Sequence, residues 1–229
     1  MEYFYTPPAN ISSDLLTIDG EEFSHLTQVM RKKAGDEITV VDGNGNAYHS
    51  TITEVSKRSA QCAIRQHMYR LHESTVDVTL AVGILKNPSR FDFLVEKATE
   101  LGVNRIVPLL TGRTIPRHAK TDRWQKIGIA AMKQSGRCVL PAIDRLVEFA
   151  DFVGGQTATT KLIAHERADT SSHDEILPAS VVICIGPEGG FTDEEISTAL
   201  RNDFRLLHLG TRRLRTETAA IVAVSRIVG

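Results

Sequence analysis

The sequence predicts an α/β fold with two parts, a small β-rich N-terminal domain (1–72) and a larger domain (73–229) with a mainly parallel sheet. Two observations predict it: apolar and polar residues alternate in the first seventy positions, and apolar β-branched runs alternate with helical repeats after them. The composition agrees, because 229 residues with 41% hydrophobic and 24% charged side chains can form sizeable cores. Disordered and fibrous classes are excluded.

The N-terminal domain is predicted to be a small β-barrel. Residues Glu37–Asp42 alternate, Gly43–Asn46 supplies a turn, and Ala47–Glu54 returns, which is typical of a hairpin. A third alternating run spans Ser59–Arg65, and a helical segment lies around Glu22–Lys32. A few closely spaced strands favour a barrel.

The pattern changes after the polar stretch Gln66–Thr75, which we expect to be a linker with the domain boundary near residue 73. The apolar, β-branched run Val76–Leu85 predicts a buried strand. Asn87-Pro88 gives an N-cap and a first-turn proline to a helix that Gly102 ends. The apolar residues of that helix repeat at helical spacing: Phe91, Leu94, Val95, Ala98 and Leu101.

The following elements continue the alternation of strands and helices. We expect a strand at Arg105–Leu110, a basic helix from Asp122 to Ser135, a strand at Lys161–Ala164 and a buried strand at Val181–Ile185. Continuous apolar strands separated by helices favour a parallel sheet that is covered on both faces.

The last segment predicts a strand, a loop and a terminal helix. Leu206–Leu209 is apolar, Gly210 and three arginines follow, and Thr216 caps a helix. Ala219–Val224 is an unbroken apolar run, so this helix has no evident solvent face and should be buried or dimeric. A strand is the alternative, because three of these residues are β-branched: Ile221, Val222 and Val224.

Charge is unevenly distributed, although the formal net charge is only -1. Lys86–Arg137 holds 11 basic and 4 acidic residues, residues 138–200 hold 3 and 11, and residues 201–229 hold 6 and 2. A basic surface is the electrostatic signature of a protein that binds a phosphate backbone. The alternative is a set of solvated helix faces.

Several classes of protein are excluded or disfavoured. Cys62, Cys138 and Cys184 have no CxxC spacing, and the histidines lack ligand spacing, so we expect no disulfide framework and no metal site. No stretch of 18 apolar residues or N-terminal signal pattern is present, so we expect a cytoplasmic protein that does not bind membranes. The GxGxxG, GxxxxGK[ST], HExxH and GxSxG motifs are missing.

A glycine-rich segment, Gly186–Glu195, follows the buried strand and is the first candidate site. Its three glycines allow the backbone to approach a ligand, while Pro187 stiffens the turn. Thr192 and Glu195 form a capping-box pattern, so the segment opens onto a helix. Open α/β sheets bind ligands at the carboxyl ends of their strands. A simple tight turn is the alternative.

Five sequence blocks resemble the uridine-N3 methyltransferases of small-subunit ribosomal RNA, in the SPOUT superfamily. They follow the family's order across nearly the whole chain: His25–Asp36, Phe93–Leu109, Met132–Arg137, Ile185–Glu195 and Leu209–Ala219. The resemblance implies a PUA-like RNA-binding barrel and an α/β domain with a trefoil knot. It also implies a homodimer that uses S-adenosylmethionine to methylate 16S ribosomal RNA or the assembled small subunit. Lys133 stands where the family often has glutamate.

The resemblance also implies a site. For the reaction itself we name candidates from their chemistry: Glu188 as a general base, directly or through water, Arg215 as a donor that stabilises the negative charge developing on the uracil, and His165 as a further candidate base. Alternatively, Glu188 and Arg215 pair with each other or with Glu217. The residues implied for cofactor binding are Ala164, His165, Glu166, Gly186, Pro187, Glu188, Gly189, Gly190, His208, Leu209, Gly210, Leu214 and Thr218.

RNA binding is expected from basic residues that contact phosphates without reading bases. Two other functions remain open, a SPOUT methyltransferase for another RNA nucleotide and a non-catalytic RNA-binding protein. The residues expected to contact RNA are Arg31, Lys32, Lys33, Lys86, Arg90, Arg117, Gln134 and Arg137.

Overall fold

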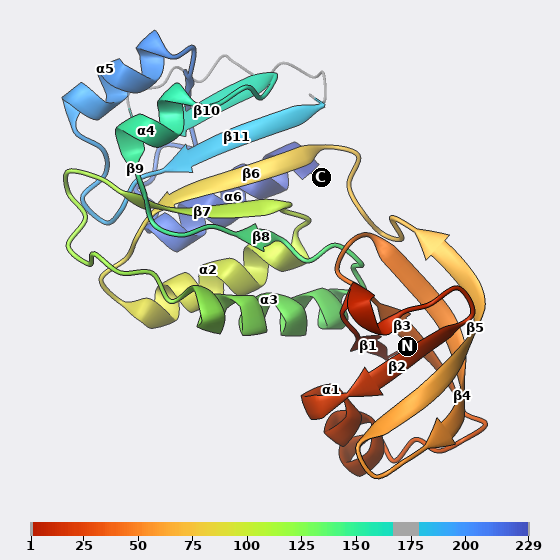
Figure 1. Ribbon diagram of the computed structural model, residues 1–229. Helices are drawn as coiled ribbons and strands as arrows, with labels where there is room; N and C mark the ends of the chain where they lie inside the picture. The colour runs from red at the N-terminus through yellow and green to blue at the C-terminus, as the bar shows by residue number, and fades with distance from the viewer. Residues whose placement is uncertain (1, 167–178, 229) are drawn as a thin grey trace. The chain divides into compact units, whose positions relative to one another are not determined.

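The computed structural model describes residues 2–166 and 179–228, which divide into two compact units (Figure 1). The first unit comprises Met1–Glu73 and Ile129–Leu140, and the second comprises Ser74–Gly128 and Pro141–Gly229. The sequence predicted a single boundary near residue 73. The structure differs in assigning residues 129–140 to the first unit.

The first unit is built on a five-stranded sheet with the order β1-β3-β4-β5-β2. The β1 strand is parallel to β3, and the other pairs are antiparallel. Its elements are β1 (Tyr3–Tyr5), the 3-10 helix η1 (Pro8–Asn10), β2 (Leu15–Asp19), α1 (Gly20–Ser24), the π-helix η2 (His25–Val29), β3 (Glu37–Val41), β4 (Asn46–Val55) and β5 (Ser59–Tyr69).

The predicted hairpin is confirmed as β3 and β4. Asp42 closes its turn, because its Oδ1 accepts the Asn44 N–H at 2.7 Å and the Asn46 N–H at 3.0 Å. Gly43 and Gly45 have φ angles of 79° and 94°, which glycine adopts readily. The expected linker is shorter than predicted, since β5 continues to Tyr69.

Residues 129–140 join the first unit through backbone hydrogen bonds to this turn. The Gly45 N–H donates to the Cys138 carbonyl at 2.9 Å, and the Leu140 N–H donates to the Gly43 carbonyl at 2.8 Å. Cys138 also packs with Val41 in a buried apolar cluster. A segment far along the chain therefore completes the fold of the N-terminal unit.

The second unit contains the predicted parallel sheet, with the order β12-β10-β11-β6-β7-β8 and β9 paired with β7. Every pairing is parallel. Its strands are β6 (Asp77–Gly83), β7 (Arg105–Leu110), β8 (Ala142–Ile143), β9 (Val147–Glu148), β10 (Thr160–Ala164), β11 (Ser180–Ile185) and β12 (Arg205–Leu207). The helices are α2 (Pro88–Glu100), α3 (Thr121–Ser135), which continues into the first unit, α4 (Phe149–Gly154), α5 (Asp193–Arg201) and α6 (Thr216–Val228).

Helices cover both faces of this sheet, as the apolar strands predict (Figure 1). Leu80 and Val82 of β6 pack in one cluster with α2 and α6. Ala81 of β6 and Cys184 of β11 pack in a second cluster with α4 and α5. Neighbouring residues of one strand enter different cores because side chains alternate across a sheet.

The helix-boundary signals read from the sequence are confirmed for α2 and α5, whereas α6 begins at Thr216 itself, the residue expected to cap it. Asn87 caps α2 by accepting the Ser89 N–H at 3.0 Å, and Gly102 follows its end with a φ of 103°. Thr192 and Glu195 form the complete capping box of α5.

The terminal segment α6 is a helix, so the strand alternative is wrong. In the single chain α6 buries Ala220 and Ala223 and exposes Thr218 and Ser225, and the expectation that a second copy covers this helix stays a prediction. The knot implied by the resemblance stays a prediction. Among residues 2–166 and 179–228, no helix combines the length and apolar character that crossing a membrane requires.

Candidate functional site

The carboxyl ends of the strands form the candidate site of the second unit. Because all pairings of this sheet are parallel, the segments that follow its strands start at the same edge. The order β12-β10-β11-β6 makes four of these strands consecutive neighbours. The sheet therefore brings together the three implied cofactor segments, Ala164–Glu166, Gly186–Gly190 and His208–Leu214.

Direct contacts join these strand ends. The His165 N–H donates to the Leu207 carbonyl at 3.2 Å, which connects β10 with β12. The Lys86 N–H donates to Oε1 of Glu188 at 3.1 Å, which connects the end of β6 with the glycine-rich segment after β11. A Cβ at Gly83 would lie 2.4 Å from Cδ of Pro187, so this approach requires glycine.

The glycine-rich segment is tightly folded on itself. The Gly190 N–H donates to the Pro187 carbonyl at 2.8 Å, and Gly190 has a φ of 69°. A Cβ at Gly186 would lie 2.9 Å from Cα of Gly190, closer than real Cβ atoms approach backbone. Gly189 is exposed, so part of this backbone is open to a ligand.

The segment after β12 presents both backbone and side-chain groups. The Arg226 guanidinium donates from Nη1 to the His208 carbonyl at 2.7 Å, which fixes that turn. Gly210 has a φ of 115°, and a Cβ there would meet no atom within 4 Å, so its backbone is open on that side. Both ring nitrogens of His208 are buried without a partner in the described chain.

These groups fit the chemistry of an adenosyl amino-acid ligand. Open glycine backbone and unpartnered polar atoms at strand ends can bind a nucleoside and an amino-acid moiety through hydrogen bonds. No group of three or more possible metal ligands occurs in the described part of the chain.

The two candidate catalytic residues, Glu188 and Arg215, have separate surroundings. Glu188 accepts the Lys86 N–H, and Arg215 is exposed. Glu217 is 8% exposed and lies 3.8 Å from Nε of Arg90, measured from its Oε1. Within the described residues, neither Glu188 nor Arg215 forms an ion pair with the other or with Glu217. The alternative in which Glu188 and Arg215 pair with each other or with Glu217 is therefore not supported.

Comparisons with known proteins match both parts of the chain. A family described as an RNA methyltransferase domain matches residues 72–228, and one described as an RNA methyltransferase PUA domain matches residues 18–65. The ribosomal RNA small subunit methyltransferase E of Synechocystis is 33% identical, over 96% of this chain and 75% of that protein. The protein of the same name from Bacillus subtilis is 30% identical, over 92% of this chain and 88% of that protein.

The chain belongs to the ribosomal RNA small subunit methyltransferase E family.

A solved structure of the methyltransferase E family supports the fold over the whole chain. The enzyme from Neisseria gonorrhoeae, bound to S-adenosyl methionine, is 34% identical with a TM-score of 0.89. The match covers 98% of this chain and 95% of that one.

The residues expected to contact RNA in this member of the family lie in both units. Arg31, Lys33 and Gln134 of the first unit are exposed, and Lys32 is half-buried. In the second unit Lys86 and Arg117 are exposed, while Arg90 is half-buried beside Glu217.

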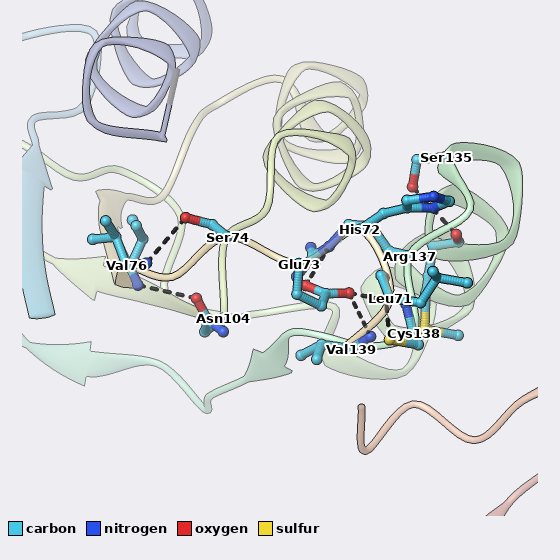
Figure 2. A network of polar contacts seen from close by, with 12 residues as sticks. Leu71, His72, Glu73, Ser74, Val76, Asn104, Ser135, Arg137, Cys138 and Val139 are labelled. Carbon is cyan, nitrogen blue, oxygen red and sulfur yellow. Dashed lines mark hydrogen bonds and ion pairs between the residues drawn. The ribbon is translucent and has the colours of Figure 1, made fainter. Parts of the chain in front are cut away.

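Arg137 does not fit the role expected for it. It is 2% exposed, and its Nη2 lies 2.7 Å from Oε2 of Glu73, whose side chain is 1% exposed (Figure 2). The other oxygen of Glu73 accepts the Cys138 and Val139 N–H groups, each at 2.9 Å. The guanidinium is occupied inside the first unit, so we correct its assignment from RNA binding to structure.

Much of the basic block is compensated by nearby carboxylates. Lys133, at the position where the family often has glutamate, pairs with Glu22 of the same unit. The sequence count of charge therefore overstates the free positive surface. Basic-block residues with a carboxylate at ion-pair distance include Arg90, Lys97, Arg105, Arg123, Lys133 and Arg137.

Arg113 is a residue of the site that the sequence reasoning missed. It lies after β7, is exposed, and donates from Nη1 to the Gly189 carbonyl at 2.7 Å. Its position three residues after the end of a predicted strand was the available signal, since strand ends are where this fold places ligands.

Proposed function

We propose that the protein transfers a methyl group from S-adenosylmethionine to N3 of a uridine in small-subunit ribosomal RNA. The observation that carries the proposal is the match along 98% of the chain to a methyltransferase E that is bound to S-adenosyl methionine. The cofactor class is supported by the exposed Gly189 and the open backbone of Gly210, which follow β11 and β12, the two strands that flank β10.

When bound, the cofactor supplies an electrophilic sulfonium methyl group, which leaves alignment and proton removal to the protein. Alignment is the larger contribution, at roughly 7–11 kcal/mol, while a general base adds about 10²–10⁴-fold. We therefore assign most residues of the strand-end segments to binding and orientation. They include the backbone groups of His208, Leu209, Gly210 and Leu214.

Glu188 is the proposed base for the imide proton of the uracil. The Lys86 N–H holds one oxygen of its carboxylate at 3.1 Å, which orients the side chain from a neighbouring strand end. Arg215 is exposed and free to stabilise the negative charge that develops on the uracil oxygens. His165, at the end of β10, is the second candidate base.

We further propose that the protein acts as a homodimer in the cytoplasm, on ribosomal RNA or the assembled small subunit. The half-buried apolar residues Ile221 and Val222 of α6 are candidates for the contact between copies. An unstacked uridine would enter the site, and phosphate contacts from Arg31, Lys33, Lys86, Arg90 and Arg117 would position it.

The test is methylation in vitro with labelled S-adenosylmethionine, using isolated small subunits and free small-subunit rRNA, followed by nucleoside analysis. The proposal expects labelled 3-methyluridine from at least one substrate. Gly186→Ala, which introduces a Cβ against the Gly190 backbone, should abolish it, and Gly154→Ala, whose Cβ enters open space, should not.

Two results would replace this function with an alternative. A labelled nucleoside other than 3-methyluridine would indicate a methyltransferase for another nucleotide. RNA binding without retention of the labelled cofactor would indicate a non-catalytic RNA-binding protein.

A further inference from the structure

The end of β7 is attached to the glycine-rich segment by two separate sets of hydrogen bonds. Oε1 of Glu195 accepts the Gly112 N–H at 2.8 Å, and its Oε2 accepts the Thr192 N–H at 2.8 Å. The carboxylate that caps α5 thus also bridges two strand ends. Gly112 also packs closely against Thr192, because a Cβ at Gly112 would lie 3.3 Å from Cγ2 of Thr192.

Arg113 forms the second attachment. Its Nη1 donates to the Gly189 carbonyl at 2.7 Å, and a Cβ at Gly189 would lie 3.3 Å from both Cβ and Cδ of Arg113. The aliphatic part of the side chain therefore packs on the backbone of Gly189. In the described part of the chain, the Gly189 carbonyl is the one hydrogen-bond partner of this guanidinium.

Glu195 already joins the two segments through the Gly112 and Thr192 N–H groups, so the bond from Arg113 is a second attachment. A guanidinium has five N–H donors in a planar fork that matches a phosphate group, and here one donor is used while the residue is exposed. A charged donor with free N–H groups beside the proposed cofactor segment is suited to an anion of the methyl acceptor.

We propose that Arg113 is a positioning residue that couples binding of the acceptor RNA to the glycine-rich segment. One N–H holds the Gly189 carbonyl, and the remaining N–H groups bind an RNA phosphate. The inference rests on the proposed function, which supplies RNA as the acceptor.

The coupling has a physical origin in side-chain entropy. An exposed arginine loses rotamer freedom when it binds, and that loss is shared between its two partners. A cofactor that orders the glycine-rich segment also orders Arg113, so the phosphate then binds to a side chain that is already fixed. The two ligands are expected to strengthen each other's binding, as dynamic coupling requires.

The test measures binding alone, with the full-length protein, a transcript of small-subunit rRNA and S-adenosylhomocysteine as an unreactive cofactor. In the unaltered protein, saturating S-adenosylhomocysteine should tighten RNA binding by about fivefold or more. Arg113→Ala should reduce this factor to about one and make the slope of log affinity against log salt shallower by roughly 0.7–0.9. Arg113→Lys should recover part of the RNA affinity through its charge but not the coupling.

Two variants act as controls. Arg201→Ala removes an exposed arginine at the end of α5. This position precedes β12 and therefore lies near the amino ends of the strands, away from the candidate site. The variant should behave like the unaltered protein. Glu195→Gln weakens the other attachment and should lower cofactor affinity without changing the salt slope of RNA binding.

The proposal is overturned if Arg113→Ala keeps the salt slope or the coupling factor of the unaltered protein. It is also overturned if the unaltered protein shows no coupling. A change of cofactor affinity alone in Arg113→Ala would overturn it too, because Arg113 would then only hold the glycine-rich segment in place. Absence of methyl transfer in the unaltered protein would refute the proposed function, while these binding measurements would still decide the role of Arg113.

Discussion

Glu73 and Arg137 form an ion pair inside the first unit, with side chains 1% and 3% exposed and Nη2 2.7 Å from Oε2. Glu73 is fully used, because its second oxygen accepts the N–H groups of Cys138 and Val139 (Figure 2). The pair thus joins the end of the N-terminal segment to residues that are 64 to 66 positions later in the chain.

Arg137→Ala should destabilise the protein by about 3–5 kcal/mol, because it leaves the buried carboxylate of Glu73 without its counter-charge. Denaturant unfolding measures this loss. Glu73→Gln in the same background should restore part of it, since a neutral amide is less costly to bury alone.

The matched control for this prediction is Arg105→Ala. Arg105 pairs with Asp144, but its side chain is 47% exposed, so its loss should cost about 0.2–1 kcal/mol. Equal losses for the two arginine variants would contradict the assignment of Arg137 to a buried structural pair.

Arg90 should contribute to RNA binding where Arg137 does not. Arg90→Ala is expected to weaken binding of small-subunit rRNA and to make its salt slope shallower by about 0.7–0.9, the value for one phosphate contact. The folded population of Arg137→Ala should keep the salt slope of RNA binding that the unaltered protein shows. Because Arg90 also lies beside Glu217, the variant is best compared with Glu217→Gln. An unchanged slope in Arg90→Ala alone would remove that residue from the RNA surface.

Gly186→Ala should weaken binding of S-adenosylmethionine by at least about tenfold, because its Cβ would lie 2.9 Å from Cα and 3.0 Å from the carbonyl carbon of Gly190. Gly189→Val should have a smaller effect, since the atoms nearest to a Cβ there belong to the flexible side chain of Arg113. Calorimetry with the unaltered protein and Gly154→Ala as references tests this order. Normal affinity in both variants would exclude the glycine-rich segment from the cofactor site.

Glu188→Gln should lower kcat by about 10²–10⁴-fold if Glu188 is the general base. The amide oxygen can still accept the Lys86 N–H, so the orientation of the segment and the cofactor affinity should change little. Single-turnover methylation gives the rate. An unchanged rate would transfer the role to His165, and His165→Gln would then be the variant to measure.

Burial of Cys62 predicts a loss of stability at high pH. Desolvation raises the pKa of its thiol from 9.0 to about 11, so the folded protein retains this proton while the unfolded chain releases it. The contribution of this proton to the free energy of unfolding is complete below about pH 9. It is lost as the pH rises to about 11, and the total loss is on the order of 2–3 kcal/mol. Denaturant unfolding of Cys62→Ala should show a shallower decline over that range than the unaltered protein. Parallel declines would contradict the raised pKa.

Sequence signals predicted the second unit well because each of them is local. The cap at Asn87, the stop at Gly102 and the capping box at Thr192 and Glu195 depend on residues within one turn of the helix end. Parallel pairing followed from the apolar strands, which need cover on both faces. The placement of the cofactor segments at one edge is a geometric consequence of that pairing.

Long-range pairing is the part that the sequence could not supply. Charge counting treated Arg137 as free, because nothing near it in the chain shows that Glu73 neutralises it. The same limit explains why residues 129–140 were expected in the second domain, since their hydrogen bonds to Gly43 and Gly45 cross more than ninety positions. Arg113 was missed because its partner, the Gly189 carbonyl, is a backbone atom that no motif marks.

The burial of all three cysteines provides a practical route to labelling. Burial raises the pKa of every native thiol, so each stays neutral and slow to alkylate in the folded protein at ordinary pH. A cysteine introduced by Thr157→Cys, at an exposed position that precedes β10, would then be the preferred target for a maleimide dye. Because that position lies before the strand rather than after it, the fluorophore would sit away from the ligand-bearing segments and could report RNA capture without blocking it.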